Sequence, residues 1–278
     1  MDGWAPLANK RLAILGCGYV GTAVARAARA AGMHVEALTR NAARARELAP
    51  LGVATVVDDL AGDAWHGRLQ PGADFVVDCV GAGGGGLDSC RHSYVAGMRS
   101  LLAWARLSPA GTIIFTSSTS VYPQGGGAVV AEDAATDGAG PTGLILIEAE
   151  ALLRAASDAR RRWFVLRPAG IYGPGRHHLL DQVRAAAPEI AGEGGHHLNL
   201  VHRDDVGAAV LALCAAPAAA DEVFNVADDA PAPKAEVVRW LAEQTGRPVP
   251  RFAGGAASRR HGFAAPPDRI ISNAKLTR

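Results

Sequence analysis

The chain has 278 residues, of which 49% are apolar and 20% charged, and its formal net charge is +1 at pH 7. This composition is ordinary for a globular protein of one large or two small domains, and the nearly neutral charge argues against nucleic acid or an anionic membrane as a partner. No apolar run reaches the ~18 residues of a membrane span, and residues 1–10 lack the charged and apolar regions of a signal peptide, so a cytoplasmic protein is expected.

Apolar runs and helical patterns alternate over the first 168 residues. Strands are predicted at 12–15, 34–38, 54–57, 75–80, 112–116 and 163–166, and helices at 22–31, 41–49, 88–106 and 143–157. Strands that are apolar throughout and alternate with helices are typical of a parallel sheet buried on both faces. The predicted fold class is therefore α/β, with a Rossmann-type doubly wound parallel sheet.

A G-x-G-x-x-G motif joins the first predicted strand to the first predicted helix. Its residues are Gly16, Gly18, Tyr19, Val20 and Gly21, with Cys17 after the first glycine. In this context the first glycine makes the tight turn, the second admits a pyrophosphate close to the backbone, and the third lets helix and strand pack closely. The helix N-terminus offers free N–H groups to the phosphates. The motif predicts a dinucleotide site; the alternative is a glycine-rich turn without a ligand.

The residues that end the second predicted strand bear on cofactor choice. NAD sites usually place Asp or Glu there, to bond the ribose 2′-OH. This chain has Thr39 and Arg40 instead, and Glu36 comes too early. Thr39 and Arg40 can accept a 2′-phosphate, with Arg40 as its charge partner, so NADP is expected, with NAD as the alternative. Arg40 can also be read as a solvated side chain at the start of a helix.

The pattern changes after residue 168. Gly, Pro and His cluster at 173–178 and 192–197, short strands are predicted near 198–201 and 223–226, and helices at 204–215 and 234–245. We predict an NAD(P)-binding Rossmann domain over 1–168 and a mostly substrate-binding, small α/β portion over 169–278. Residues 198–226, approximately, are expected to return to the Rossmann core. Substrate specificity is expected to lie in the loops at 83–87, 124–140 and 173–197.

The order of these segments resembles the short-chain dehydrogenase/reductase superfamily, on its extended, NAD-dependent epimerase/dehydratase side. The segments that carry the resemblance are 16–21, 58–60, 79–82, 116–122, 166–175, 199–206 and 224–226. The resemblance implies that Asp59 and Leu60 meet the adenine, and that Val80 and Gly81 lie along the cofactor. It also places Pro168 beside the nicotinamide and a hydroxyl of 116–122 toward the substrate.

The helix that carries the catalytic pair of this superfamily is different here. The usual pair is Tyr-x-x-x-Lys, and no such spacing occurs in this chain. Alignment on Glu150 places Thr142 at the tyrosine position and Leu146 at the lysine position. A threonine hydroxyl is a poor proton donor near neutral pH, and leucine has no polar group to bind ribose. The G-x-G-x-x-G spacing is also unlike the G-x-x-G-x-x-G usual in extended members. The missing pair and this spacing both resemble the atypical branch of the superfamily, in which chemistry varies or is lost.

Another hydroxyl must then pass the proton, if one is transferred. The predicted constellation is Ser118 with Tyr122 or Tyr172. Each has a plain structural alternative: Ser118 can bond to backbone, and both tyrosines can pack as core aromatics. Tyr94, near the cofactor mouth, and His202, more simply a helix cap, are secondary candidates. A phenol without a lysine titrates near ~10, so such a site suits an electrophilic substrate such as an imine or conjugated carbonyl.

Three function classes follow. The first is an NADP-dependent oxidoreductase or epimerase-type enzyme acting on a small molecule. The second is a non-catalytic NAD(P)-binding sensor or scaffold. The third, RNA binding, has no support from charge. We expect a monomer or homodimer and no metal, because the four cysteines lack C-x-x-C spacing and the paired histidines at 177–178 and 196–197 have no ligand spacing around them.

Overall fold

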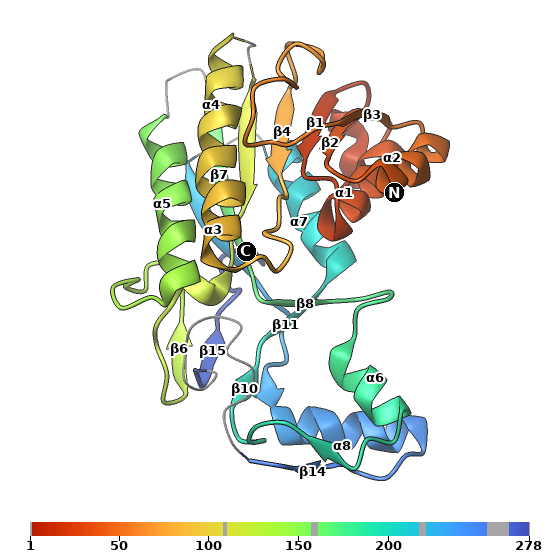
Figure 1. Ribbon diagram of the computed structural model, residues 1–278, viewed down its shortest axis with the longest axis vertical. Helices are drawn as coiled ribbons and strands as arrows, with labels where there is room; N and C mark the ends of the chain where they lie inside the picture. Colours follow the sequence, from red (N-terminus) through yellow and green to blue (C-terminus); the bar gives the residue numbers. More distant parts are fainter. Residues whose placement is uncertain (1, 108–109, 157–160, 217–220, 255–266, 278) are drawn as a thin grey trace. The chain divides into compact units, whose positions relative to one another are not determined.

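The computed structural model describes residues 2–107, 110–156, 161–216, 221–254 and 267–277, and its largest sheet has seven strands in the order β12-β7-β5-β4-β1-β2-β3 (Figure 1). The strands are Arg11–Leu15 (β1), His34–Thr39 (β2), Ala54–Val57 (β3), Phe75–Asp78 (β4), Thr112–Thr116 (β5), Arg162–Pro168 (β7) and Glu222–Val226 (β12). Adjacent strands from β3 to β7 are parallel. The predicted α/β class with a doubly wound sheet is confirmed.

The central strands are buried along their whole length. Every residue of β4 and β5 is buried, and β1 is buried after Arg11, whereas the edge strand β3 exposes Ala54 and Val57. Strands β1, β2 and β3 extend the sheet one way, and β4, β5 and β7 extend it the other. The carboxyl ends of β1 and β4 therefore form a topological switch point, where open α/β sheets bind ligands.

Helices cover this sheet between the strands. They are α1 (Tyr19–Ala30), α2 (Ala42–Leu48), α3 (Gly86–Cys90), the π-helical turn η3 (Arg91–Ala96), α4 (Gly97–Leu107), α5 (Pro141–Ala155) and α7 (Arg203–Ala215), with short 3₁₀ turns η1 (Asp2–Leu7), η2 (Ala49–Leu51) and η4 (Thr119–Val121). Helix α1 packs against α7, and its buried face consists mainly of small residues, such as Gly21 and Ala25. A Cβ on Gly207 would lie 3.5 Å from the Ala23 backbone, so the two helices approach closely.

By internal contacts the chain divides into two compact units. The first contains 1–118, 144–167 and 203–224, and the second contains 119–143, 168–202 and 225–278. This division assigns 119–143 to the second unit, while the predicted functional domains at 1–168 and 169–278 stay a prediction.

The second unit is built from small strand pairs and two helices. Its elements are β6 (Ala128–Val130) with β15 (Arg269–Ile271), β8 (Gly170–Tyr172) with β11 (Leu200–His202), β9 (Glu189–Ile190) with β14 (Arg251–Phe252), β10 (His197–Leu198) with β13 (Ala232–Pro233), α6 (His178–Arg184) and α8 (Lys234–Thr245). Helices α6 and α8 share an apolar cluster that includes Val183, Val238 and Leu241.

The sequence patterns located most of the larger elements. Predicted strands 54–57 and 112–116 and predicted helix 234–245 have the observed bounds, and α1 begins at Tyr19 rather than at residue 22. Helix α6 lies inside the segment 173–197, which was expected to be a loop. Within the described residues, none of the helices combines the length and apolar character needed to cross a bilayer.

Candidate functional site

The glycine turn after β1 has the close approach that the motif predicts at Gly16. Its φ is +78°, and an added Cβ would lie 2.5–2.6 Å from side-chain and backbone atoms of Val80, which follows β4. Any other residue here would be strained and would push the ends of β1 and β4 apart. The Gly16 and Cys17 N–H groups both donate to the Leu38 carbonyl at 2.9 Å, which fixes the turn against β2.

The next two glycines differ in what surrounds them. An added Cβ on Gly18 would have no atom nearer than 3.9 Å, so this position faces open space. On Gly21 it would lie 3.0 Å from the Gly16 carbonyl and 3.1 Å from Ile14, which is tight helix–strand packing. Gly18 is the N-cap of α1 and supplies no side-chain cap to the first N–H groups of the helix. These groups are oriented for an anion.

Three charged side chains meet beside the ends of β2 and β3. Arg40 is exposed, and its Nη1 lies 3.6 Å from Asp59 Oδ2; His92 Nε2, from η3, lies 3.1 Å from the same oxygen. Burial raises the pKa of Asp59, but hydrogen bonds from Ala61 and His92 and the charge of Arg40 outweigh it and hold that pKa below its usual range. The carboxyl of Asp59 is therefore ionised near neutral pH.

Thr39 is less available than Arg40. Its side chain is buried, and its Oγ1 accepts a hydrogen bond from the Asn41 N–H at 3.3 Å. Asn41 then caps α2 by accepting from the Ala43 and Arg44 N–H groups. The structure thus leaves Arg40, of the predicted pair, with its charge at the surface.

The segment after β4 is held by hydrogen bonds to Ala82. Ser89 Oγ donates to the Ala82 carbonyl at 2.6 Å, and the Ala82 N–H donates to the Tyr94 hydroxyl. Gly81 is exposed, and an added Cβ there would meet nothing within 4 Å. Leu60, in contrast, is buried and packs under Gly97 of α4. Val80 and Gly81 therefore lie at the open switch point, and Leu60 forms part of the wall beside it.

Asp78, the last residue of β4, is a buried carboxyl that the sequence analysis missed. Its Oδ1 accepts from the Val80 N–H at 3.0 Å, and its Oδ2 has no hydrogen-bond partner among the described residues. Burial raises the pKa of Asp78 to about 7, and the Val80 hydrogen bond opposes this only in part. Asp78 lies within an apolar run, and its acidic side chain is the one feature of that run that could have indicated a functional residue.

A second missed group joins the ends of β5 and β7 to α5. Glu150 is fully buried, and it accepts from Ser117 Oγ at 2.7 Å, from Arg167 Nε and Nη2 at 3.0 and 2.7 Å, and from Arg154 at 2.8 Å. Buried charge is tolerated when it is paired and hydrogen-bonded in this way. The network fixes Ser117, the neighbour of the half-buried Ser118.

The two candidate tyrosines have different surroundings. Tyr122 is fully buried and donates its hydroxyl to Asn225 Oδ1 at 2.8 Å. Tyr172 is partly exposed and lies between the rings of His177 and His202, with centroids 5.2 and 5.3 Å away. The contacts of Tyr122 are those of a packing aromatic, whereas Tyr172 is partly exposed.

The remaining predicted residues lie on α1, β7 and α5. Tyr19 and Val20 form the first turn of α1, and the guanidinium of Arg203 lies 4.8 Å from the Tyr19 ring centre. Pro168 ends β7 and is buried. Thr142 and Leu146 lie on α5, and Leu146 is only 2% exposed, so it is a core residue.

The site fits a dinucleotide. The uncapped start of α1, the open space at Gly18 and the close contact of Gly16 with Val80 match what a pyrophosphate needs. Among the described residues no three His, Cys, Asp or Glu side chains are grouped as a metal site would be.

Comparisons with known proteins point to one family. The family described as "NAD dependent epimerase/dehydratase family" matches residues 12–227. Protein YeeZ of Escherichia coli is 30% identical over 249 residues, which cover 87% of this chain and 86% of that protein. The 2-alkyl-3-oxoalkanoate reductase of Stenotrophomonas maltophilia is 27% identical over 248 residues, covering 84% of this chain and 74% of that protein. A solved UDP-glucuronic acid 4-epimerase of Bacillus cereus, in complex with NAD, has the same fold, with a TM-score of 0.80 at 19% identity over 96% of this chain and 91% of that one.

Proposed function

The chain belongs to the NAD-dependent epimerase/dehydratase family, and we propose that it is an NADP(H)-dependent oxidoreductase acting on a small polar or electrophilic carbonyl or imine. The observation that carries the cofactor assignment is the exposed Arg40 at the end of β2, where NAD sites usually have an acidic residue. We expect the protein to act in the cytoplasm as a monomer or homodimer.

The chain's own groups account for binding. The first N–H groups of α1, beside Gly18, would receive the pyrophosphate, and Arg40 would receive the 2′-phosphate. When bound, the nicotinamide supplies or accepts a hydride. Val80, Gly81 and Pro168 remain proposed cofactor contacts.

For proton transfer we propose Ser118 with Tyr172. Both are partly exposed, whereas Tyr122 is fully buried and its hydroxyl is engaged by Asn225. Neither tyrosine is followed by a lysine at the fourth position. The Tyr-x-x-x-Lys spacing that usually activates the tyrosine in this family is therefore absent, which favours a substrate that itself attracts the hydride strongly. The Stenotrophomonas relative, named as a reductase of a 3-oxo acid, supports a carbonyl substrate class.

The experiment is a screen of carbonyl and imine compounds for NADPH oxidation, followed by variants on the first active substrate. Ser118→Ala and Tyr172→Phe are expected to lower kcat by roughly 10²–10⁴-fold, the usual contribution of a positioned acid or base. Tyr122→Phe is the matched control and should retain activity. Wild-type rates in both Ser118→Ala and Tyr172→Phe would contradict the assignment.

A second function, a non-catalytic NAD(P)-binding sensor or scaffold, is favoured by one observation. The chain has no Tyr-x-x-x-Lys, and Leu146 in the predicted lysine position is buried. NADPH binding without turnover in the whole screen would support this function in place of the enzyme.

A further inference from the structure

The cluster of Arg40 and Asp59 beside the cofactor site contains a third side chain, His92. Asp59 Oδ2 lies 3.6 Å from Arg40 Nη1 and 3.1 Å from His92 Nε2. Arg40 follows β2, Asp59 follows β3 and His92 lies on η3, so the cluster brings together three separate segments. All three side chains are substantially exposed, at 49%, 40% and 53%. The cluster is therefore accessible to a ligand.

The position of the cluster indicates which part of a dinucleotide it faces. Strands β2 and β3 are parallel neighbours, so the residues after them lie at the same edge of the sheet. In Rossmann folds this edge, at the end of the second strand, receives the adenosine ribose. Arg40 Nη2 is also 3.9 Å from where a Cβ on Gly83 would be, so its guanidinium reaches toward the loop after β4.

A phosphate at this edge of the sheet would have two neighbouring donors. Asp59 offsets part of the charge of Arg40, and the His92 imidazole beside the same carboxylate adds a ring N–H that can donate to a phosphate oxygen. We propose that His92 is a specificity-determining residue that reads the 2′-phosphate together with Arg40, while Asp59 holds both side chains in place. This proposal rests on the proposed function, because it assumes that an adenine dinucleotide binds at this edge.

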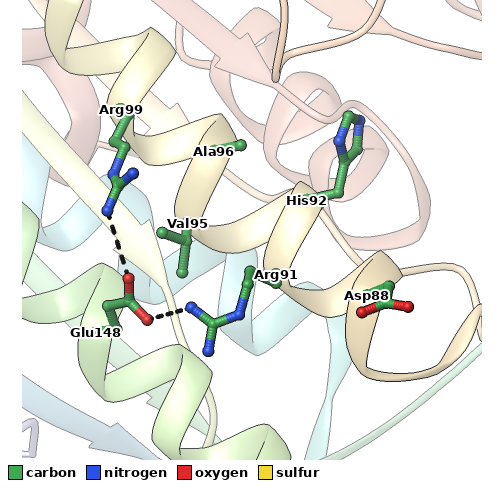
Figure 2. A pocket seen from close by; sticks show the side chains of 7 residues that line it. All are labelled: Asp88, Arg91, His92, Val95, Ala96, Arg99 and Glu148. Carbon is green, nitrogen blue, oxygen red and sulfur yellow. Dashed lines mark hydrogen bonds and ion pairs between the residues drawn. The ribbon is translucent and has the colours of Figure 1, made fainter.

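Two of the other charged groups near His92 pair with a third, Glu148. On its own helical segment stand Asp88 and Arg91, and from α4 and α5 come Arg99 and Glu148. Figure 2 shows Arg91 and Arg99 both reaching Glu148, with contacts of 2.6 and 3.5 Å, while the His92 ring points away from that carboxylate. The pocket they line is about 210 Å³, below the ~300 Å³ at which small-molecule sites begin.

The proposal predicts a ligand preference that depends on the His92 side chain. The pKa of Asp59 is below its usual range, so Asp59 is ionised near neutral pH and can hold both neighbours. Replacement of His92 should therefore weaken the binding of a ligand with a 2′-phosphate more than the binding of one without it.

The test measures binding of adenosine 2′,5′-bisphosphate and adenosine 5′-monophosphate by calorimetry, to the wild type and to His92→Asn under the same buffer conditions. We expect the affinity ratio of the two ligands to be roughly fivefold higher for the wild type than for His92→Asn, as for an exposed charge-assisted contact. Arg91→Gln, the adjacent exposed residue, is the control and should behave as the wild type.

The outcomes separate the two proposals. If both ligands bind but His92→Asn and wild type show the same ratio, the role of His92 is wrong and the proposed function stands. If neither ligand nor either dinucleotide binds at millimolar concentration, the proposed function fails and this inference fails with it. An equal fall of the ratio in Arg91→Gln would also overturn the assignment to His92.

Discussion

The glycine turn after β1 and helix α5 differ in how closely they match the pattern expected for this family. The turn has the glycine motif, whereas α5 has no Tyr-x-x-x-Lys. At the turn, each of the three glycines has the surroundings that a dinucleotide requires, including the open space at Gly18. Helix α5, which we expect to correspond to the segment that carries Tyr-x-x-x-Lys in this family, has Thr142 and a buried Leu146 at the positions predicted for the pair. The helix is nevertheless kept in place by Glu150, which bonds to Ser117 and Arg167.

This difference shows that the scaffold and the chemistry of a site can change separately. Glu150 positions the ends of β5 and β7, so α5 has a structural task that does not need a tyrosine or a lysine. The cofactor turn has no comparable structural role. The uncapped start of α1 and the open space at Gly18 contribute nothing to packing but suit a bound ligand. Fold membership therefore supports cofactor binding more strongly than it supports any one reaction.

The largest expected effect on cofactor affinity is at the cofactor turn. Gly18→Val adds a side chain in the space that the pyrophosphate would occupy, and no protein atom lies within 3.9 Å of its Cβ. NADP(H) affinity should fall at least roughly 100-fold, which is about 2.7 kcal/mol, while the thermal unfolding midpoint changes little. Gly67→Val is the control, since its Cβ also meets nothing within 4 Å. Unchanged affinity in Gly18→Val would show that the turn does not hold a phosphate.

The next test concerns the structural task of α5. Glu150→Ala strands the buried Arg167 without its partner and should lower the free energy of unfolding by about 3–5 kcal/mol. Glu148→Ala, on the same helix, removes exposed ion pairs with Arg91 and Arg99 and should cost at most about 1 kcal/mol. Chemical denaturation measures both. Equal losses in the two variants would mean that α5 is not anchored by Glu150.

Asp78, which ends β4 beside the cofactor turn, should make the free energy of unfolding depend on pH. Its folded pKa is raised to about 7, so between pH 4 and 7 the unfolded chain ionises this carboxyl while the folded protein keeps its proton. Folding stability should therefore fall as the pH rises through this range, by at most about 4 kcal/mol. Asp78→Asn keeps an acceptor for the Val80 N–H but cannot ionise, so it should gain stability over the wild type from pH 5 to pH 8. A constant difference across that range would contradict the buried, protonated state.

The smallest expected effect is at the predicted tyrosine position of α5. Thr142→Ala should change kcat by less than about twofold, because a threonine hydroxyl is a poor proton donor. Leu146→Met, which conserves volume, should cost less than about 1.5 kcal/mol of stability and leave turnover intact. Steady-state rates on an identified substrate provide the measurement. Loss of turnover in Thr142→Ala, with folding and cofactor binding retained, would show that the proton donor lies on α5 and would contradict the assignment to Ser118 and Tyr172.

The sequence predicted the parts of the fold that are locally encoded. The strands of the main sheet are continuous apolar runs, so β3 and β5 were placed with their observed bounds. The pairs β6–β15 and β9–β14 were missed, because each strand has only two or three residues and its partner is far away in the chain. Helix α6 was missed within a stretch dominated by Gly, Pro and His.

The candidate site also has one part that a local motif encodes and another that depends on residues far apart in the chain. The glycine turn is a local motif and was found in the sequence, whereas the pairs Asp59–His92 and Ser117–Glu150 each join residues 33 positions apart. Only the parallel sheet brings such residues to one edge. The burial of Tyr122 and of Thr39 likewise depends on packing that no local pattern records.

The most direct test of the central claim is the titration of the purified wild-type protein with NADPH and with NADH, followed by nicotinamide fluorescence. An intact cofactor turn with Arg40 as the reader of the 2′-phosphate predicts saturable binding of both, with NADPH bound more tightly. The 2′-phosphate contact should contribute on the order of 1–3 kcal/mol, and Arg40→Ala should remove the preference while NADH binding persists. No binding of either dinucleotide at millimolar concentration would contradict the account, and equal losses for both in Arg40→Ala would contradict the role of Arg40.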